Sequence, residues 1–242
     1  ISTNEIYKTL GYIDIQRMLE PRLIYGSYPD ILNQSADTQI LLRNLTDSYL
    51  YKDILATENI RKPDLLDKLL RALAYQVGSE VSYNELAQTV GSDSKTVEKY
   101  IELLEKCFII FRLNGLSRNL RNELKKAKKI YFYDNGVRNA VIQQFAPLEM
   151  RNDVGALWEN FFISERIKRN HYQQYYCNMY FWRTQSQQEI DYIEERDGMM
   201  TVFEMKWNPK KANATIPEAF LKAYPIKETT IITPENYLDW LL

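Results

Sequence analysis

Apolar positions in the first part of the chain recur three and four residues apart, which is the spacing of one helix face. Between residues 5 and 62 this pattern predicts an all-helical unit, and a break at Tyr25–Pro29 separates two of its helices. From Pro63 to Leu113 the pattern predicts a helix, a short extended link, a short helix, a capped helix and a strand.

That second order of elements is typical of a winged helix-turn-helix. We therefore expect a helical subdomain at 1–62 and a winged helix at 63–128. The most basic segment of the chain, 112–129, falls where the wing and its linker are expected. A wing that contacts phosphates and a solvated linker are both compatible with it, and its candidate nucleic-acid-binding residues are Arg118, Arg121, Lys125 and Lys126.

After residue 129 the pattern changes to short apolar or alternating runs, which predict strands. The expected order is a strand, two helices, three strands joined by short turns, a helix and a final strand. The three consecutive strands are expected at 175–183, 189–195 and 199–207, with helices near 153–169 and 217–223. The fold class is thus an α/β (α+β) multidomain chain, whose last unit, 129–242, is a mixed sheet flanked by helices.

Composition narrows the classes of function. The 242 residues are 45% hydrophobic and 26% charged, which is a globular composition. The net charge of −1 means that nucleic-acid binding would have to come from a local patch. Two cysteines and one histidine cannot supply a four-ligand zinc site within one chain. No apolar run approaches the roughly 20 residues of a membrane span, so we expect no membrane contact and a cytoplasmic location. Because the chain begins at Ile1, we expect it to be part of a longer gene product or a shortened form.

Acidic and basic residues gather on two of the predicted strands. Glu189 and Asp191 are two residues apart, as are Glu204 and Lys206, so each pair shares one face of its strand. If these strands pair as a hairpin, carboxylates and an ammonium group crowd one patch. Oxygen clusters of this kind hold hard cations such as Mg²⁺, and a lysine beside them stabilises negative charge at a phosphate. By itself, however, Glu-x-Lys on a strand is more often a surface ion pair.

The order of elements in 153–233, with these residues on it, resembles the PD-(D/E)xK nuclease-like fold, also called restriction-endonuclease-like. The resemblance implies that Asp191 and Glu204 bind Mg²⁺. It also implies that Lys206 orients the attacking water or stabilises the phosphate in the transition state. Ile190 precedes Asp191, where the motif often has proline.

The resemblance also implies an acidic residue on the preceding helix, and Glu159 is the best match for that position. Glu165 lies on the apolar stripe of the same helix and is the alternative, since a carboxylate there also needs a partner. Glu189 is a supporting or alternative residue of the same site.

Longer motifs lie at Tyr25–Pro29, Tyr49–Ile54, Lys129–Gly136, Gly155–Asn160, Phe181–Arg183, Glu189–Tyr192 and Glu204–Lys206. Over nearly all of 20–240 the chain is similar to the C-terminal region of a family of prokaryotic AAA+-type ATP-binding proteins. No G-x-x-x-x-G-K-[ST] motif occurs, so the resemblance implies that ATP and the ATPase core belong to the parent protein and not to this chain.

Three functions follow from these observations. The first is a Mg²⁺-dependent phosphodiester hydrolase acting on DNA or RNA under control of an ATPase core. The second is an inert nuclease-like fold that binds protein or nucleic acid or forms a homo-oligomer, its acids bridged by Lys206, Arg183 or Lys210. The third is a regulator that binds duplex DNA through the winged helix.

Overall fold

The computed structural model describes residues 1–33, 37–46, 62–116, 128–184, 186–211 and 215–242. The described part of the first 62 residues is helical, as predicted, and the break at Tyr25–Pro29 separates two helices. Its helices are α1 (Thr3–Leu10), α2 (Tyr12–Arg17), α3 (Leu19–Tyr25), α4 (Pro29–Leu32) and α5 (Thr38–Leu45).

The next unit has the order predicted for a winged helix. Gly91, in the left-handed region with φ 71°, ends α8, and the Asp93 carboxylate accepts the Thr96 backbone N–H to cap α9. Strand β3 was predicted as the first strand of the last unit, but it pairs antiparallel with both β1 and β2. The elements are α7 (Pro63–Tyr75), β1 (Glu80–Val81), α8 (Tyr83–Val90), α9 (Ser94–Lys106), β2 (Ile110–Gly115) and β3 (Lys128–Phe132).

The remaining chain also follows the expected order. Strands β4, β5 and β6 form an antiparallel meander, and β7 lies parallel to β6. The short C-terminal helix α14 was not predicted. The elements are α11 (Asn135–Val141), α12 (Val154–Tyr172), β4 (Asn178–Arg183), β5 (Glu189–Arg196), β6 (Met199–Met205), α13 (Glu218–Ala223), β7 (Ile226–Ile232) and α14 (Leu238–Leu241), with single 3₁₀ turns at Leu148–Met150 and Pro209–Lys211.

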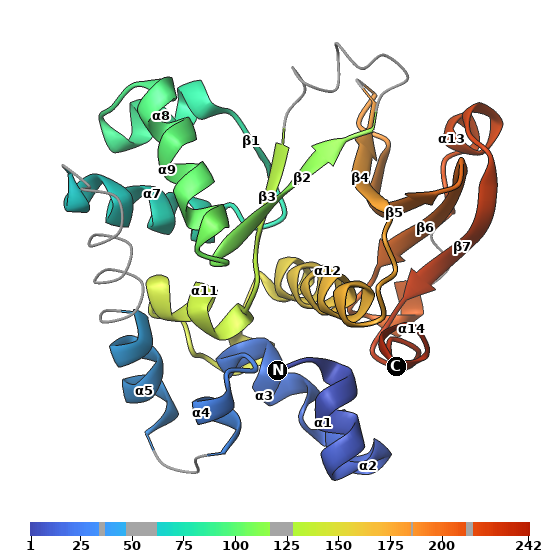
Figure 1. Cartoon of the computed structure of the whole chain (residues 1–242), viewed down its shortest axis with the longest axis horizontal. Coiled ribbons are helices and arrows are strands. Elements are labelled where there is room, and N and C mark those ends of the chain that lie inside the picture. The colour runs from blue at the N-terminus through green and yellow to red at the C-terminus, as the bar shows by residue number, and fades with distance from the viewer. Residues whose placement is uncertain (34–36, 47–61, 117–127, 185, 212–214) are drawn as a thin grey trace.

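One mixed sheet runs through both of the last two units, in the order β1-β3-β2-β4-β5-β6-β7. The join is the short parallel pairing of β2 with β4, at Asn114↔Tyr180 and Gly115↔Phe181. The sheet therefore crosses the boundary expected at 128/129, and the strands of the winged helix lie beside those of the C-terminal unit (Figure 1).

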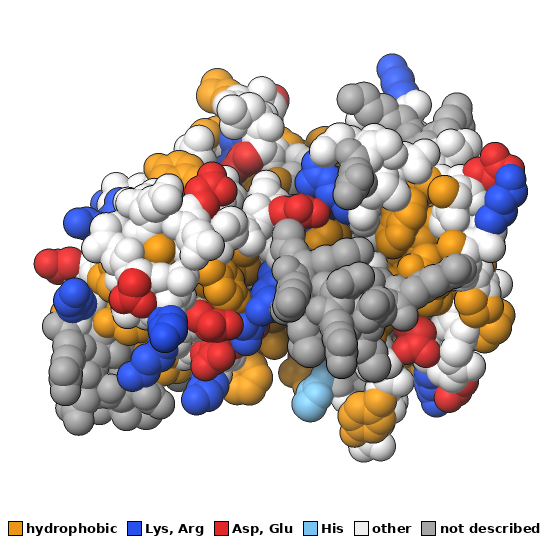
Figure 2. Space-filling view, turned by 90° about the horizontal axis from the view of Figure 1, so that it is seen from above, with side chains coloured by type: hydrophobic (Ala, Val, Ile, Leu, Met, Phe, Trp, Pro, Cys, Tyr) orange, Lys and Arg blue, Asp and Glu red, His pale blue; other side chains and the backbone are white. Residues whose placement is uncertain are grey.

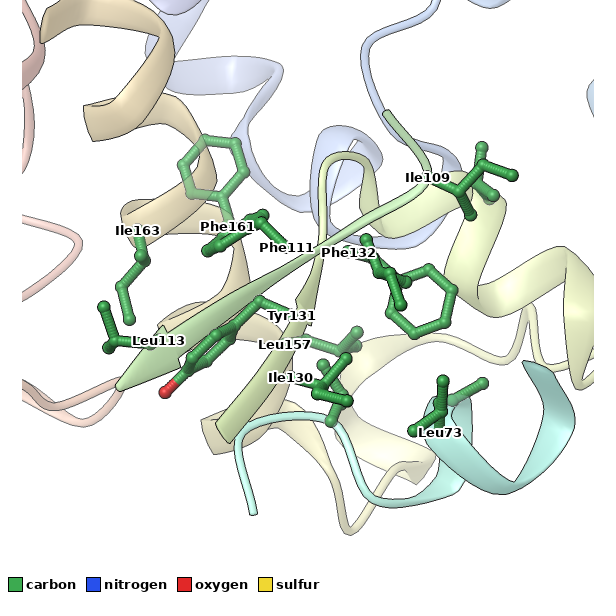
Figure 3. Close-up of a cluster of buried hydrophobic side chains, with 14 of the residues drawn as sticks. Leu73, Ile109, Phe111, Leu113, Ile130, Tyr131, Phe132, Leu157, Phe161 and Ile163 are labelled. Carbon is green, nitrogen blue, oxygen red and sulfur yellow. The ribbon is translucent and has the colours of Figure 1, made fainter. Parts of the chain in front are cut away.

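Helices cover the C-terminal part of the sheet on two sides. Helix α12 belongs to the main core, which joins all three units, and Figure 3 shows Leu73 of α7, Phe132 of β3 and Phe161 of α12 in that cluster. Helix α13 packs through Phe220 against a second cluster that contains Trp182. The expected mixed sheet flanked by helices is thus confirmed. In the described part of the chain, no helix is long and apolar enough to cross a membrane.

The N-terminal helices dock on the start of α11. The Ser27 backbone N–H donates to Asp134 at 2.7 Å, and a Cβ added at Gly136 would lie 2.1 Å from the Tyr25 carbonyl oxygen. A Cβ at Gly26 would likewise collide with the Asp134 carboxylate, so the contact requires glycine at both Gly26 and Gly136.

Candidate functional site

The candidate site forms where two neighbouring strands separate. The pairing of β5 with β6 reaches Tyr192↔Phe203; beyond it, β5 continues along β4 and β6 along β7. Asp191 and Glu204 are the next residues at this fork. The Met205 backbone N–H donates to Asp191 Oδ2 at 2.9 Å, and the Asp191 backbone N–H bonds to the Glu204 carboxylate. The two carboxylates thus close the open end of the ladder.

Lys206 completes the strand motif. Its Nζ lies 2.5 Å from Glu204 Oε1. Burial, followed by the charge of Asp191, raises the pKa of Glu204. Burial opposes the charge on Lys206, but the hydrogen bond and charge of Glu204 outweigh it and raise the Lys206 pKa. Asp191, Glu204 and Lys206 therefore form one coupled group, as the motif implies.

Helix α12 brings Glu159 to the same group. Glu159 Oε1 accepts the Tyr131 hydroxyl at 2.5 Å and the Lys129 ammonium at 3.2 Å. The Tyr131 ring lies in the apolar cluster with its hydroxyl at the edge (Figure 3). Burial and then the charge of Asp191 raise the pKa of Glu159 to about 7, against the opposing effect of Lys129. Glu159 is thus the helix acid that lies near the strand carboxylates.

Sequence reasoning did not place Lys129 in the site, and named it only in the basic segment and in the motif Lys129–Gly136. The Lys129 side chain is 3% exposed, and its Nζ lies 3.2 Å from Glu159 and 2.5 Å from Glu189. Burial opposes its charge, yet the charges of Glu159, Asp191 and Glu189 raise the Lys129 pKa above its usual range. An ammonium from β3, the strand that pairs with β1 and β2, therefore lies among these carboxylates.

Glu189 lies at the periphery of this group. Besides Lys129 it faces Arg183, at 3.9 Å, and Arg183 also lies 3.8 Å from Glu80 of β1. These half-exposed contacts are long and contribute little free energy. They extend the ion-pair chain from β5 to the winged helix.

Glu165, the alternative helix acid, belongs to a separate buried cluster. It pairs with Arg22 at 3.1 Å and Lys168 at 2.7 Å, and it accepts the Thr3 backbone N–H at 2.6 Å. Burial raises its pKa, but Lys168, Arg22 and the Thr3 hydrogen bonds prevail and lower the pKa of Glu165 to about 2. This cluster joins α1 and α3 to α12 and does not extend to Asp191.

The carboxylate oxygens of the site are suitable ligands for a hard cation, but the arrangement of the side chains is not. Among the described residues, no three Asp, Glu, His or Cys side chains converge in a way that could hold a metal ion. Lys129 and Lys206 pair with the carboxylates instead. In this conformation the side chains therefore do not form a Mg²⁺ site.

The candidate nucleic-acid-binding residues Arg118, Arg121, Lys125 and Lys126 lie outside the described residues. Arg112, just before them, is paired with Glu105 at 2.5 Å. On the face seen in Figure 2, acidic and basic side chains of the described residues are interspersed. The duplex-binding interpretation stays a prediction.

Curated relatives are similar to about half of this chain. "Uncharacterized protein Mb2031c" of Mycobacterium bovis and "Uncharacterized protein Rv2008c" of Mycobacterium tuberculosis are each 27% identical over 139 residues, which is 55% of this chain and 30% of each relative. An uncharacterised protein of Haemophilus influenzae is 25% identical over 124 residues, 49% of this chain and 31% of the relative. The matched region is thus about a third of the relatives' length. No solved structure matches.

Two family models match in succession. The domain of unknown function DUF4143, which is typically found with AAA ATPases, covers residues 154–240 and so contains Glu159, Asp191, Glu204 and Lys206. The domain of unknown function DUF8612 covers residues 16–148, more than half of the chain, and contains Lys129. The chain therefore belongs to the DUF8612 family, and its DUF8612 region is followed by a DUF4143 domain.

Proposed function

We propose that this chain is a module of a larger ATPase-associated protein and that the group at Asp191 and Glu204 is the site of a Mg²⁺-dependent phosphodiester hydrolase. One observation carries the proposal. Glu159 of α12, Asp191 of β5, and Glu204 and Lys206 at the end of β6 come together from three elements.

The surrounding fold supports the same assignment. The order α12, β4, β5, β6, α13, β7 is the one that the nuclease-like resemblance implies, and β7 pairs parallel with β6. In the proposal Asp191 and Glu204 contribute oxygen ligands for the cation, and the Lys206 ammonium faces the phosphate. Before the cation can bind, the ion pairs that Lys129 and Lys206 make with the carboxylates have to break.

The link to an ATPase rests on relatives and not on this chain's own residues. DUF4143 domains are typically found with AAA ATPases, and the matched region is only 30% of the mycobacterial relatives. We propose that an ATPase core elsewhere in the parent protein controls access to the site, since the sequence of this chain has no P-loop motif.

The test is cleavage of supercoiled plasmid, single-stranded DNA and a structured RNA by the full chain with Mg²⁺ or Mn²⁺. We expect Asp191→Asn and Lys206→Met to abolish cleavage. Asp197→Asn in the exposed β5–β6 turn and Lys210→Met on the surface are matched controls that should cleave normally. The proposal is overturned if the wild-type chain neither cleaves these substrates nor binds Mg²⁺ in calorimetry.

A second candidate function is an inert nuclease-like fold that serves as a binding module. The observation that favours it is the pairing of the site's carboxylates with Lys129 and Lys206. On this hypothesis the wild-type chain binds no divalent cation, and the ion pairs act only in stability. Lys206→Met would then lower the unfolding temperature, and neither this variant nor the wild-type chain would cleave nucleic acid.

A further inference from the structure

We propose that Lys129 is an internal counter-cation of the candidate site: its ammonium neutralises Glu159 and Glu189, and a divalent cation binds only when this lysine is displaced. The inference rests on the proposed function, because it concerns the same carboxylates. It explains why their donor chemistry suits a hard cation while their arrangement excludes one.

The position of the Lys129 ammonium carries the argument. Nζ lies 2.5 Å from Glu189 and 3.2 Å from Glu159, so it bridges an acid of β5 and an acid of α12. With 3% of its side chain exposed, water cannot take the place of these partners. The charge of Lys129 also acts on Asp191, so the ammonium would repel a divalent cation placed there. Ammonium and cation therefore exclude each other.

Lys206 does not have the same constraint. Its side chain is 28% exposed and lies on the same strand as its partner Glu204, so it can turn toward water while the strand stays in place. Lys129 lies on β3 between its partners and the Phe181 ring, 5.4 Å from Nζ. Its displacement depends on the position of β3, which is paired with β1 and β2.

A second contact ties the same two units together. Arg183 of β4 lies 3.8 Å from Glu80 of β1 and 3.9 Å from Glu189. Gly78, at the turn before β1, lies so close that a Cβ there would be 3.5 Å from Glu159 Oε1. The placement of β1 and β3 thus sets which partners these acids have, and in the proposal cation entry depends on that placement.

The test compares Lys129→Met with Lys128→Met in calorimetric titrations of the full chain with Mg²⁺ and Mn²⁺. Both variants remove one positive charge from adjacent residues of β3. The Lys128 ammonium lies over the Tyr83 ring, 5.0 Å from its centre, and not at the site. We expect Lys129→Met to bind the cation about tenfold more tightly than wild type or better, as removal of one nearby like charge implies. Lys128→Met should bind as wild type does.

A measurement on the wild-type chain covers the case in which Lys129→Met does not fold. Acetic anhydride labelling with peptide mass spectrometry reports whether the Lys129 amine is accessible. We expect it to be protected without cation and labelled at saturating Mg²⁺, with the exposed Lys95 as internal standard. Equal protection of Lys129 in the cation-bound chain overturns the inference.

The two proposals fail in different ways. If wild type and Lys129→Met bind Mg²⁺ equally, the counter-cation role is wrong and the hydrolase proposal stands. If neither binds a cation, both proposals are wrong. If Lys129→Met binds and wild type does not cleave, the counter-cation role stands and the cleavage assay alone decides the hydrolase.

Discussion

Replacement of Glu165 by glutamine tests the buried cluster that fixes α1 and α3 on α12. The carboxylate is 2% exposed and faces Arg22, Lys168 and the Thr3 backbone. Glutamine keeps the size and removes the charge, so the Arg22 guanidinium loses its ionic partner. Loss of one partner of a buried ion pair is strongly destabilising because the other charge remains buried.

The size of the effect follows from the pKa of Glu165. In the folded chain it is lowered from its usual value of 4.5 to about 2, and a difference of this size corresponds to about 3 kcal/mol of stability. Because the folded-state pKa is the lower one, this stability is present above about pH 4.5. It is lost as the pH falls through 2. Glu165→Gln should therefore cost about 3 kcal/mol at pH 7, and the difference from wild type should narrow below pH 4.5.

The assay is urea unfolding followed by fluorescence of the four tryptophans, from pH 7 to pH 3. Glu102→Gln, at an exposed position of α9, is the matched control and should leave the midpoint unchanged at every pH. A loss below about 1 kcal/mol at pH 7, or a loss that does not vary with pH, would refute the electrostatic reasoning. Because Glu165 lies outside the candidate site, cation affinity of the folded Glu165→Gln chain should equal that of wild type.

Two further predictions concern the packing between units. Gly136→Ala should destabilise the chain by several kcal/mol or prevent folding, since its Cβ would lie 2.1 Å from the Tyr25 carbonyl oxygen, whereas Gly155→Ala, with nothing within 4 Å, should fold normally in circular dichroism. Phe220→Ala should cost about 3–5 kcal/mol in urea unfolding by opening a cavity under α13. Leu221→Ala, 43% exposed on the same helix, should cost far less; equal losses at both positions would contradict the packing of the second cluster.

The helices between residues 63 and 106 were predictable because their signals are local. Gly91 and Asp93 each act within one turn, and the structure has both where the sequence expects them. The predicted strand at 107–113 starts later, at Ile110, since Phe108 takes a left-handed backbone conformation with φ 56° after α9. An apolar residue at such a position gives no sequence signal, because positive φ there is uncommon.

The choice between Glu159 and Glu165 could not be made from the helix pattern. Helix α12 is buried on most sides, and both acids lie among buried neighbours such as Trp158 and Phe162. Periodicity identifies a solvent-facing stripe only when one exists. What separates the two acids is their long-range partners, Tyr131 and Lys129 for one and Arg22 for the other.

Lys129 was missed for a related reason. Charge counting groups it with the basic residues that precede it, but strand alternation puts it on the opposite face from Ile130, and the strand is buried from Lys129 onward. A lysine at the start of a buried strand needs a carboxylate partner, because an unpaired buried charge is costly. That partner, Glu189, lies on β5, and β5 is connected to β3 only through β2 and β4. No local rule predicts the two residue pairs that join β2 to β4.

The candidate site therefore lies at the boundary between the two family regions. Residues 154–240 contain Glu159, Asp191, Glu204 and Lys206, whereas Lys129 comes from the region 16–148. A DUF4143 segment produced alone would lack the ammonium that neutralises Glu159 and Glu189, and it would expose the face of α12 that packs on β3. Cation binding or cleavage by such a segment would measure a site that the whole chain does not have. Only a comparison within the full chain, with Lys129 as the single difference, separates the chemistry of the carboxylates from its control by the winged helix.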